Sequence, residues 1–232
     1  MIDTTRLCEK ARRYGIDAAP VARALDTYAQ YLVQYNEKVN LTAITDPEGI
    51  EDRHFIDSLL LAMQPEMRGD AVDVGTGAGF PGVVAKLYRP EIAMTLMEPT
   101  GKRVEFLRSL CERLGIEAQL VKERAEEAAR KRWREQFDVA TARAVAALPA
   151  LAEYCLPLVK VGGVFIAMKG AGAHEEAEAA RRAAEKMGGE LADVRAFTLP
   201  DGSARSLLVY RKVRPTPPVY PRNGGKIAKS PL

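Results

Sequence analysis

The sequence predicts an α/β fold built on a doubly wound, mostly parallel sheet, with a helical extension before it. Three observations support this fold class. From residue 70 onward, apolar strand candidates alternate with helical stretches, as in parallel sheets covered by helices. The first candidate strand ends in a glycine-rich turn. The last two are separated only by the turn at 199–203, which makes the final strand antiparallel.

The first 66 residues are predicted to form helices. Apolar side chains recur at helical spacing in two stretches, and the polar segment 35–42 between them resembles a helix end followed by a loop. The recurring residues are Ala22, Leu25, Tyr28, Ala29 and Leu32, and then Ile56, Leu59, Leu60 and Met63. We therefore expect an N-terminal helical extension over residues 1–66.

The region 67–213 is expected to form the sheet domain. The strand candidates are 70–75, 92–97, 117–122, 137–142, 161–168, 190–198 and 205–213. The helices expected between them are 101–114, 124–134, 147–159 and 173–187. Seven strands with a reversed last strand follow the plan of the methyltransferase variant of the doubly wound sheet. A dinucleotide dehydrogenase more often continues with a sixth parallel strand and a second domain.

The segment 214–232 is rich in Pro and Gly, and we expect an extended or mobile tail there. From Gly202 to the C-terminus the chain has seven Lys or Arg residues and no Asp or Glu. Such an asymmetry is a candidate footprint for nucleic-acid phosphates, although a solvated tail is an equally ordinary interpretation.

The most informative motif is the stretch 72–82, where an apolar strand runs into four glycines within eight residues. Glycines allow the backbone to approach a ligand closely, and a strand, such a turn and a helix together form a nucleotide-binding corner. The spacing is ambiguous. Gly77, Gly79 and Gly82 match the dinucleotide pattern, Gly75, Gly77 and Gly79 match the S-adenosylmethionine pattern, and a plain strand–helix turn is a third reading.

Two flanking residues favour S-adenosylmethionine. Asp73 stands two residues before the first glycine, where a carboxylate can reach a cationic amino-acid tail. Pro81 removes one N–H donor from the helix start that would otherwise face a pyrophosphate. Glu98 ends the second strand and can accept both ribose hydroxyls, which fits either cofactor.

The composition excludes several classes of protein. No run of about eighteen apolar residues could span a membrane, and the N-terminus has no apolar signal segment. Cys8, Cys111 and Cys155 are too few and too scattered for a disulfide framework or a zinc site. We therefore expect a cytoplasmic protein without a metal.

Several motifs together resemble the RsmG (GidB) family of bacterial 16S rRNA 7-methylguanosine methyltransferases, over about residues 35–232. They are Asn36–Thr42, Arg53–Leu59, the loop ending at Gly79–Gly82, Lys102–Leu107, Ala142–Ala144, Met168–Gly170, Tyr220–Arg222 and Lys229–Leu232. One residue departs from the family pattern: Asn223 stands where Arg or Lys is more usual.

The resemblance implies a Rossmann-like S-adenosylmethionine-dependent methyltransferase. Its substrate would be 16S rRNA or the 30S subunit, methylated at N7 of guanine 527 of the small-subunit RNA. The implied cofactor contacts are Gly75, Phe80, Glu98, Pro99, Thr100, Ala125, Glu126 and Arg143, with Gly77 and Gly79 in the same loop. Arg143 and Lys169 are the candidate catalytic residues.

The chemistry of the guanine N7 atom fits this residue set. N7 carries a lone pair and no proton, so its methylation needs alignment and no base. Arg143 stays protonated and can only bind or orient. His54 is either a base or, more in keeping with a helical position, a contact to substrate or to a neighbouring segment. Lys169 either faces RNA phosphate or is solvated.

Two other functions are compatible with the sequence. One is a methyltransferase of the same fold that acts on a small molecule or a protein. The other is a nucleotide-binding regulator without catalysis. The transfer of methyl groups to ribosomal subunits would separate the first reading from both alternatives.

Overall fold

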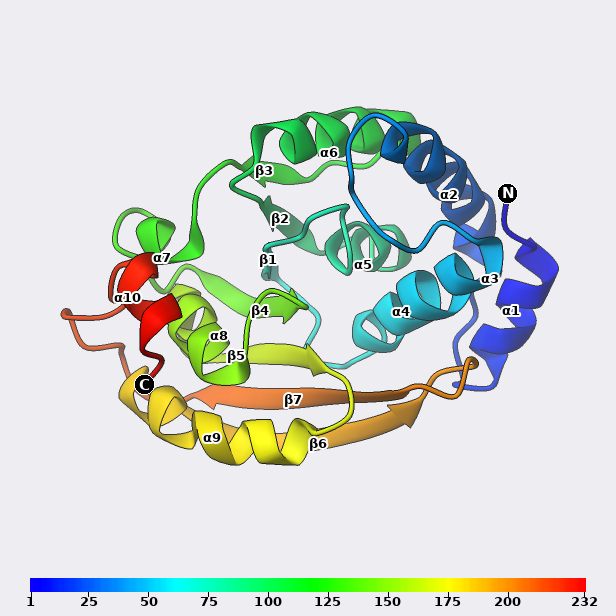
Figure 1. The fold of residues 1–232 in the computed structure, drawn as a ribbon. Helices are drawn as coiled ribbons and strands as arrows, with labels where there is room; N and C mark the ends of the chain where they lie inside the picture. Colours follow the sequence, from blue (N-terminus) through cyan, green and yellow to red (C-terminus); the bar gives the residue numbers. More distant parts are fainter.

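The computed structural model describes residues 1–232 and has one seven-stranded sheet with helices on both faces (Figure 1). The strand order is β3-β2-β1-β4-β5-β7-β6. The strands are β1 (Asp70–Val74), β2 (Ala93–Met97), β3 (Gln119–Val121), β4 (Phe137–Arg143), β5 (Val159–Lys169), β6 (Gly189–Thr198) and β7 (Ala204–Lys212). Strand β7 is inserted between β5 and β6 and runs antiparallel to both, which confirms the predicted reversal of the last strand.

The longer helices also follow the predicted pattern. They are α1 (Thr4–Arg12), α2 (Ala22–Asn36), α4 (Asp57–Ala62), α5 (Gly82–Tyr88), α6 (Gly101–Leu114), α8 (Leu148–Cys155) and α9 (Ala173–Lys186). Short helical turns are η1 (Ala19–Val21), α3 (Pro47–Gly49), the π-helical η2 (Ile50–Ile56), α7 (Ala125–Ala128), η3 (Leu156–Leu158) and α10 (Gly224–Lys229). No helix is long and apolar enough to cross a bilayer.

Three expected elements differ from the structure. The helix predicted over 124–134 ends at Ala128, and turns follow to residue 135, where Glu135 has a positive φ of 52°. The helix predicted over 147–159 ends at Cys155, because Pro157 has no N–H to continue it, and β5 begins at Val159. The third predicted strand, 117–122, is paired only over residues 119–121.

The prediction of an extended or mobile tail is wrong for its last part. Asn223 caps the helix α10, since its side-chain oxygen accepts a hydrogen bond of 2.9 Å from the Lys226 N–H. Ile227 in this helix is fully buried. The composition of the tail disfavours a helix, but tertiary packing overrides that local preference.

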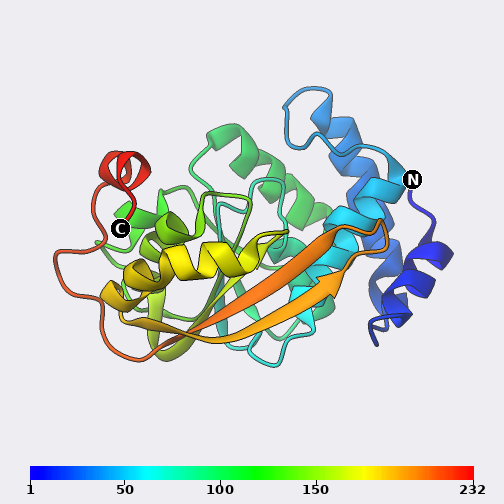
Figure 2. The same cartoon turned by 60° about the horizontal axis from the view of Figure 1, so that its bottom comes forward.

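The two faces of the sheet pack into two separate apolar cores. Helices α1, α2, α4, α5 and α6 share one core with Val139, Ile166 and Val209 of the sheet. Helices α7, α8 and α9 share the other, which contains Ala140 and Phe165. Alternate residues of a strand thus enter opposite cores. In Figures 1 and 2 the N-terminal helices lie at one end of the molecule and the C-terminal segment at the other.

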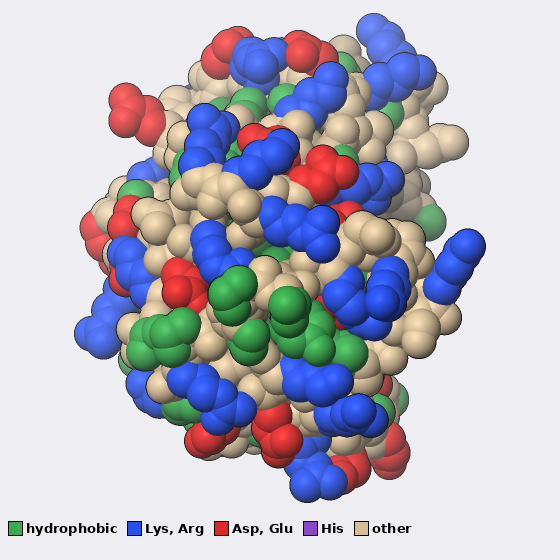
Figure 3. Space-filling view, turned by 90° about the vertical axis from the view of Figure 1, so that its left-hand side faces the viewer, with side chains coloured by type: hydrophobic (Ala, Val, Ile, Leu, Met, Phe, Trp, Pro, Cys, Tyr) green, Lys and Arg blue, Asp and Glu red, His purple; other side chains and the backbone are tan.

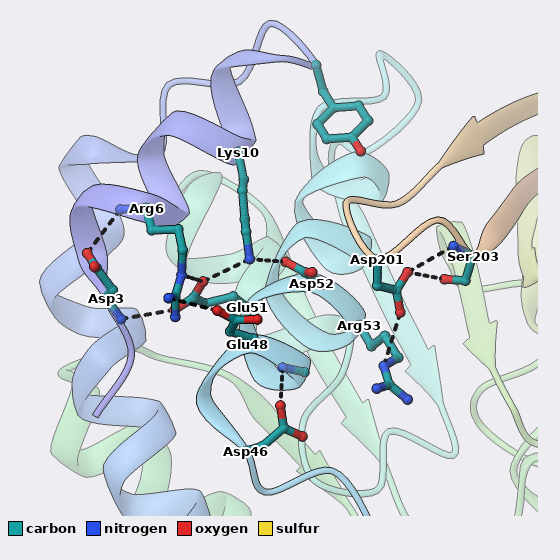
Figure 4. A network of polar contacts seen from close by, with 12 residues as sticks. Asp3, Arg6, Lys10, Asp46, Glu48, Glu51, Asp52, Arg53, Asp201 and Ser203 are labelled. Carbon is teal, nitrogen blue, oxygen red and sulfur yellow. Dashed lines mark hydrogen bonds and ion pairs between the residues drawn. The ribbon is translucent and has the colours of Figure 1, made fainter.

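Polar contacts fix the N-terminal helix α1 to η2 (Figure 4). The fully buried Glu51 accepts hydrogen bonds from Arg6 Nε at 2.8 Å and from Lys10 Nζ at 3.1 Å. On the far side of η2, Arg53 lies 3.2 Å from Asp201 in the β6–β7 turn. The π-helical segment is therefore held on both sides, and its next residues face the end of β4.

Candidate active site

A cavity of about 620 Å³ lies at the carboxyl ends of β1, β2 and β4. In the sheet order, β2 and β3 lie on one side of β1, and β4 and β5 lie on the other. The strand order therefore reverses between β1 and β4, and ligands of doubly wound folds bind at such a switch point. The lining residues are Val74, Gly75, Met97–Thr100, Arg103, Glu123–Glu126, Ala144–Ala147, Ala150, Tyr154, Ala228 and Pro231. A larger hollow of about 1040 Å³ lies at the amino ends of the same strands, where no glycine loop is present.

The glycine loop follows β1 and depends on left-handed backbone angles. Gly75, Gly77 and Gly79 have φ of +68°, +59° and +96°, values that L side chains rarely adopt. Asp73 lies beneath the loop and accepts hydrogen bonds from Thr76 Oγ1 at 2.6 Å and from the Gly82 N–H at 2.8 Å. The same carboxylate therefore holds both ends of the loop.

Asp73 is fully buried, and its second oxygen, Oδ1, has no hydrogen-bond partner. Burial raises the pKa of Asp73 to about 6 against the hydrogen bonds from Thr76 and Gly82, which lower it. The side chain does not line the cavity. Its two hydrogen bonds in this structure shape the loop.

Glu98 is the acid that faces the cavity from the end of β2. Its two oxygens accept hydrogen bonds from the Gly77 N–H at 3.1 Å and the Thr100 N–H at 2.9 Å, and Arg103 lies 3.7 Å away. These contacts fix the carboxylate while it still forms part of the cavity wall. A carboxylate at this position is suited to accept hydrogen bonds from the two hydroxyls of a ribose.

Six of the predicted cofactor contacts line this one cavity: Gly75, Glu98, Pro99, Thr100, Ala125 and Glu126. The structure places Gly77, Gly79, Phe80, Arg143 and Lys169 outside its lining. A Cβ at Gly79 would lie 2.6 Å from the hydroxyl oxygen of Tyr28, so this glycine makes room for the helix α2. Tyr28 donates a hydrogen bond to the Ala78 carbonyl of the same loop.

Phe80 lies in a buried stack of rings. Its ring centroid is 4.9 Å from that of Tyr28 and 4.3 Å from that of His54, with both pairs nearly parallel. The Arg143 guanidinium lies over the same ring at 5.2 Å. Phe80 thus connects the glycine loop to α2, η2 and β4, and we infer that it supports the loop from behind.

Arg143 ends β4 and turns toward η2 and α4. Its Nη1 donates to Asp57 Oδ2 and to the Arg53 carbonyl, both at 2.8 Å. Its Nη2 lies 3.3 Å from His54 Nδ1. Arg205 Nε lies 2.7 Å from the other Asp57 oxygen, at ion-pair distance but poorly aligned for a hydrogen bond. Two arginines from different strands therefore share one fully buried carboxylate.

His54 is held as a neutral ring. Burial, together with the neighbouring Arg143 charge, lowers the pKa of His54 to about 3. The Nδ1 atom faces the Arg143 donor, and Nε2 lies 3.0 Å from Thr42 Oγ1. Arg143 can only donate, so Nδ1 accepts and Nε2 carries the proton toward Thr42. With both nitrogens engaged, His54 joins the chain segments around it and is poorly suited to act as a base.

Lys169 holds the wall of the cavity from the end of β5. Its Nζ donates to the Ala146 carbonyl at 3.0 Å and lies 2.7 Å from Glu176 Oε2. Glu176 also accepts a hydrogen bond from the Leu148 N–H at 3.0 Å. The segment Ala144–Ala147, which lines the cavity, is thus held at its C-terminal end by one ion pair.

Two important residues had no functional assignment from the sequence. Asp57 stands among apolar neighbours on a helical face, which is a signal for a buried and paired acid. Ala228 reaches the cavity from the tail, and no local pattern of the sequence indicates this contact. The first could have been found by asking which acid a buried helix face contains, whereas the second depends on the tertiary structure alone.

The residues present fit S-adenosylmethionine. Glu98 is oriented for a ribose, the backbone of Gly75 lies open to the cavity, and alanines and prolines provide apolar surface for a flat base. The cavity volume lies in the range of sites that enclose small-molecule ligands.

Comparison with solved structures supports the fold. M. jannaschii TYW2 in complex with AdoMet superposes with a TM-score of 0.52 at 14% identity, over 68% of this chain and 75% of that one. A SAM-dependent O-methyltransferase from Thermotoga maritima gives a TM-score of 0.50 at 13% identity, over 80% and 73%. At these identities the likeness concerns the fold alone.

Sequence comparison shows the family. The model described as "rRNA small subunit methyltransferase G" (GidB) matches residues 21–207. A protein named ribosomal RNA small subunit methyltransferase G from Lactobacillus delbrueckii subsp. bulgaricus is 46% identical over 97% of both chains. Its namesake from Halalkalibacterium halodurans is 48% identical over 90% of this chain and 91% of its own. The chain therefore belongs to the family of ribosomal RNA small-subunit methyltransferase G and uses S-adenosylmethionine as its cofactor.

Proposed function

We propose that the enzyme methylates N7 of a guanine in 16S rRNA, and by the family resemblance guanine 527. The observation that carries the proposal is the arrangement around Arg143. This arginine and Lys169 are fixed as donors, and His54 has both nitrogens engaged. Such a site can orient a substrate atom that already has a free lone pair, and N7 of guanine is such an atom.

The chain would hold the cofactor through Gly75, Glu98, Pro99, Thr100, Ala125 and Glu126, which share one cavity. Bound S-adenosylmethionine supplies an electrophilic methyl group. Two N–H groups of Arg143, on Nε and Nη2, have no partner within the protein. We propose that they donate to O6 of the incoming guanine, which lies beside N7, and so orient the base.

Basic side chains around the cavity mouth support an RNA substrate. Figure 3 shows Lys and Arg spread over the face that includes the C-terminal segment. Arg124 is exposed and lines the cavity, and the exposed Lys102, Lys122, Lys226 and Lys229 lie within two residues of its lining. N7 lies in the deep groove of A-form RNA, which side chains cannot read, so the target guanine belongs to a loop, a bulge or a distorted helix. We propose a cytoplasmic location, which would fit an enzyme that acts on ribosomal RNA.

The test is transfer of tritium from labelled S-adenosylmethionine to 30S subunits and to naked 16S rRNA, followed by mapping of the labelled nucleotide. We expect a single labelled guanine, at which borohydride reduction followed by aniline treatment cleaves the RNA chain, a reaction specific for 7-methylguanine. Label on an exocyclic amine or on a pyrimidine would overturn the proposal. Label on protein or small molecules only would favour the alternative substrates.

A further inference from the structure

The C-terminal segment makes a contact that its basic composition does not suggest. Ala228 of α10 and Pro231 line the same cavity as Glu98 and Ala125. Gly224, at the start of α10, lies against the Glu126 side chain, since a Cβ built there would overlap Glu126 Oε1. The segment therefore touches the cavity directly and also touches one of the acids expected to hold the cofactor.

An ion pair fixes this segment in place. Glu153 of α8 is fully buried, and Arg222 donates to it from Nε at 2.9 Å and from Nη2 at 2.6 Å. The Arg222 backbone N–H adds a third bond of 2.8 Å to the same carboxylate, and Arg222 Nη1 donates to the Ser230 carbonyl at 3.0 Å. One arginine thus joins the core helix α8 to both ends of α10.

Further contacts hold the chain that leads to α10. Arg130 Nε donates to the Pro221 carbonyl at 2.7 Å, and Arg134 Nη1 donates to the Tyr220 carbonyl at 2.9 Å. Tyr220 and Leu232 pack against the core formed by α7, α8 and α9. These bonds engage backbone groups of the Pro-rich stretch that no regular structure would satisfy.

From these contacts we infer that residues 222–231 form the outer wall of the cofactor pocket and that Arg222 is the positioning residue for this wall. The small apolar residues Ala228 and Pro231 line the cavity together with Ala125 and Glu126, and Gly224 of the same segment lies against Glu126. Such a surface suits the flat face of an adenine, and Glu126 lies where it can meet the polar edge of the base. The inference concerns cofactor binding and holds whichever RNA atom receives the methyl group.

The first test places a larger side chain in the cofactor cavity by a substitution in α10. Ala228 is exposed, so Ala228→Trp adds a large side chain without disturbing a core. Val219→Trp is the matched control, because Val219 is 72% exposed in the same segment and does not line the cavity. Calorimetry with S-adenosylhomocysteine is expected to show at least about a tenfold loss of affinity for Ala228→Trp, since the ring takes ligand space, and wild-type affinity for the control. Equal affinities would overturn the inference.

The second test removes the ion pair that holds residues 222–231 against α8. Arg222→Ala leaves the Glu153 charge buried without its partner, so α10 is expected to detach from α8. Re-exposing on the order of 50–100 Å² of bound ligand corresponds to roughly a tenfold or greater loss in affinity. The KM for the cofactor should rise by this factor, while kcat at saturating cofactor changes much less.

Arg214→Ala is the matched control, because Arg214 donates only to the Glu185 carbonyl, away from the cavity. A chain truncated after Val213 should show the same loss as Arg222→Ala, with far-UV circular dichroism confirming the sheet. Wild-type cofactor affinity in a folded truncated chain would overturn the inference. A loss of RNA methylation with unchanged cofactor affinity would also contradict it, and would instead assign the segment to RNA.

Discussion

At the scale of single residues, the site depends on pairs that are distant in sequence. The Asp57 carboxylate compensates the charges of two arginines. Arg143 lies 86 residues further along the chain, and Arg205 lies further still. Glu98 is oriented by the backbone of the glycine loop, 21 residues before it. In each case a buried charge is compensated by a partner from another element, and removal of one member leaves the other without compensation.

We expect Arg143→Ala to reduce methyl transfer more than cofactor binding. Loss of a charged hydrogen-bonding partner costs about 1.5–3 kcal/mol, and a misplaced base adds about a hundredfold. Arg143→Lys should recover little, because an ammonium cannot replace the planar fork that contacts Asp57, the Arg53 carbonyl and His54 together. Single-turnover kinetics with 30S subunits, alongside calorimetry, separates the two effects. Full turnover with weak cofactor binding would assign Arg143 to the cofactor alone.

Gly79 and Gly77 should differ when replaced by alanine, although both have positive φ. A Cβ at Gly79 would lie 2.6 Å from the Tyr28 hydroxyl and 2.8 Å from Val83, whereas at Gly77 its nearest neighbour is the Gly75 carbonyl oxygen at 3.8 Å, an ordinary contact. Gly77→Ala should therefore lower the free energy of unfolding by about 1–2 kcal/mol, which is the backbone strain alone. Gly79→Ala should lower it by the same strain plus about 1–3 kcal/mol for overpacking. Urea unfolding measures both variants.

Tyr28→Phe in the Gly79→Ala background provides the control for this explanation. The double variant should regain part of the lost stability, since the phenol oxygen is the nearest atom to the new methyl group. Strict additivity of the two substitutions would show that Tyr28 does not limit the space at Gly79.

At the scale of elements, short segments of the chain are fixed by side chains from elsewhere. Lys169 and Glu176 fasten the cavity-lining segment Ala144–Ala147, and the π-helical η2 is held between α1 and the β6–β7 turn. The end of strand β7 is held by a side chain in a similar way. Lys212 is fully buried and donates to the Leu156 carbonyl at 2.7 Å and to Thr216 Oγ1 at 2.5 Å, so it joins the last strand to the start of the tail.

Lys212 should make stability depend on pH. Burial lowers the pKa of Lys212 to about 8 from the usual 10.5, against the opposite effect of Glu135. Between these two values the unfolded chain binds more protons than the folded one, so stability rises with pH in this window. Relative to Lys212→Met, the native protein should gain up to about 3 kcal/mol from pH 8 to pH 10.5.

Denaturant unfolding at several pH values measures this difference, and Lys186→Met, at a half-exposed helical position, provides the baseline. A difference between native protein and Lys212→Met that stays flat across the window would mean that Lys212 remains charged in the fold at high pH.

At the scale of the whole molecule, the cavity lies between two regions that the sequence separates. The N-terminal helices support the glycine loop from behind through Tyr28, and the C-terminal segment lines the opposite wall through Ala228. The seven basic residues near the C-terminus consequently differ in their surroundings. Arg205, Lys212 and Arg222 pair with acids of the protein, and Arg214 donates to a backbone carbonyl. The exposed residues without such a contact are Arg211, Lys226 and Lys229.

The exposed lysines should serve RNA and leave the cofactor unaffected. The double variant Lys226→Ser/Lys229→Ser is expected to bind 16S rRNA more weakly and with a shallower salt dependence, by about 0.7–0.9 in log–log slope for each lost phosphate contact. Its affinity for S-adenosylhomocysteine should equal that of the native protein, because neither side chain lines the cavity. Filter binding across a salt series gives the slope. An unchanged slope would place the RNA surface around Lys102, Lys122 and Arg124 only.

Local sequence patterns predicted the plan of the sheet, the glycine loop and the acid Glu98. These features depend on local periodicity and on residues within one strand–turn–helix unit, where neighbours in sequence are neighbours in space. The family resemblance added Ala125 and Glu126, which do line the cavity.

Three features emerge only from the folded chain: the reason for a glycine at Gly79, the neutral state of His54 and the contacts of the C-terminal tail. The reason is physical: Tyr28 meets Gly79 from another helix, Arg143 meets His54 from a strand, and Arg222 finds its acid 69 residues away. Spacing along the chain does not predict such long-range contacts, because it is the packing of the two cores that brings these partners together.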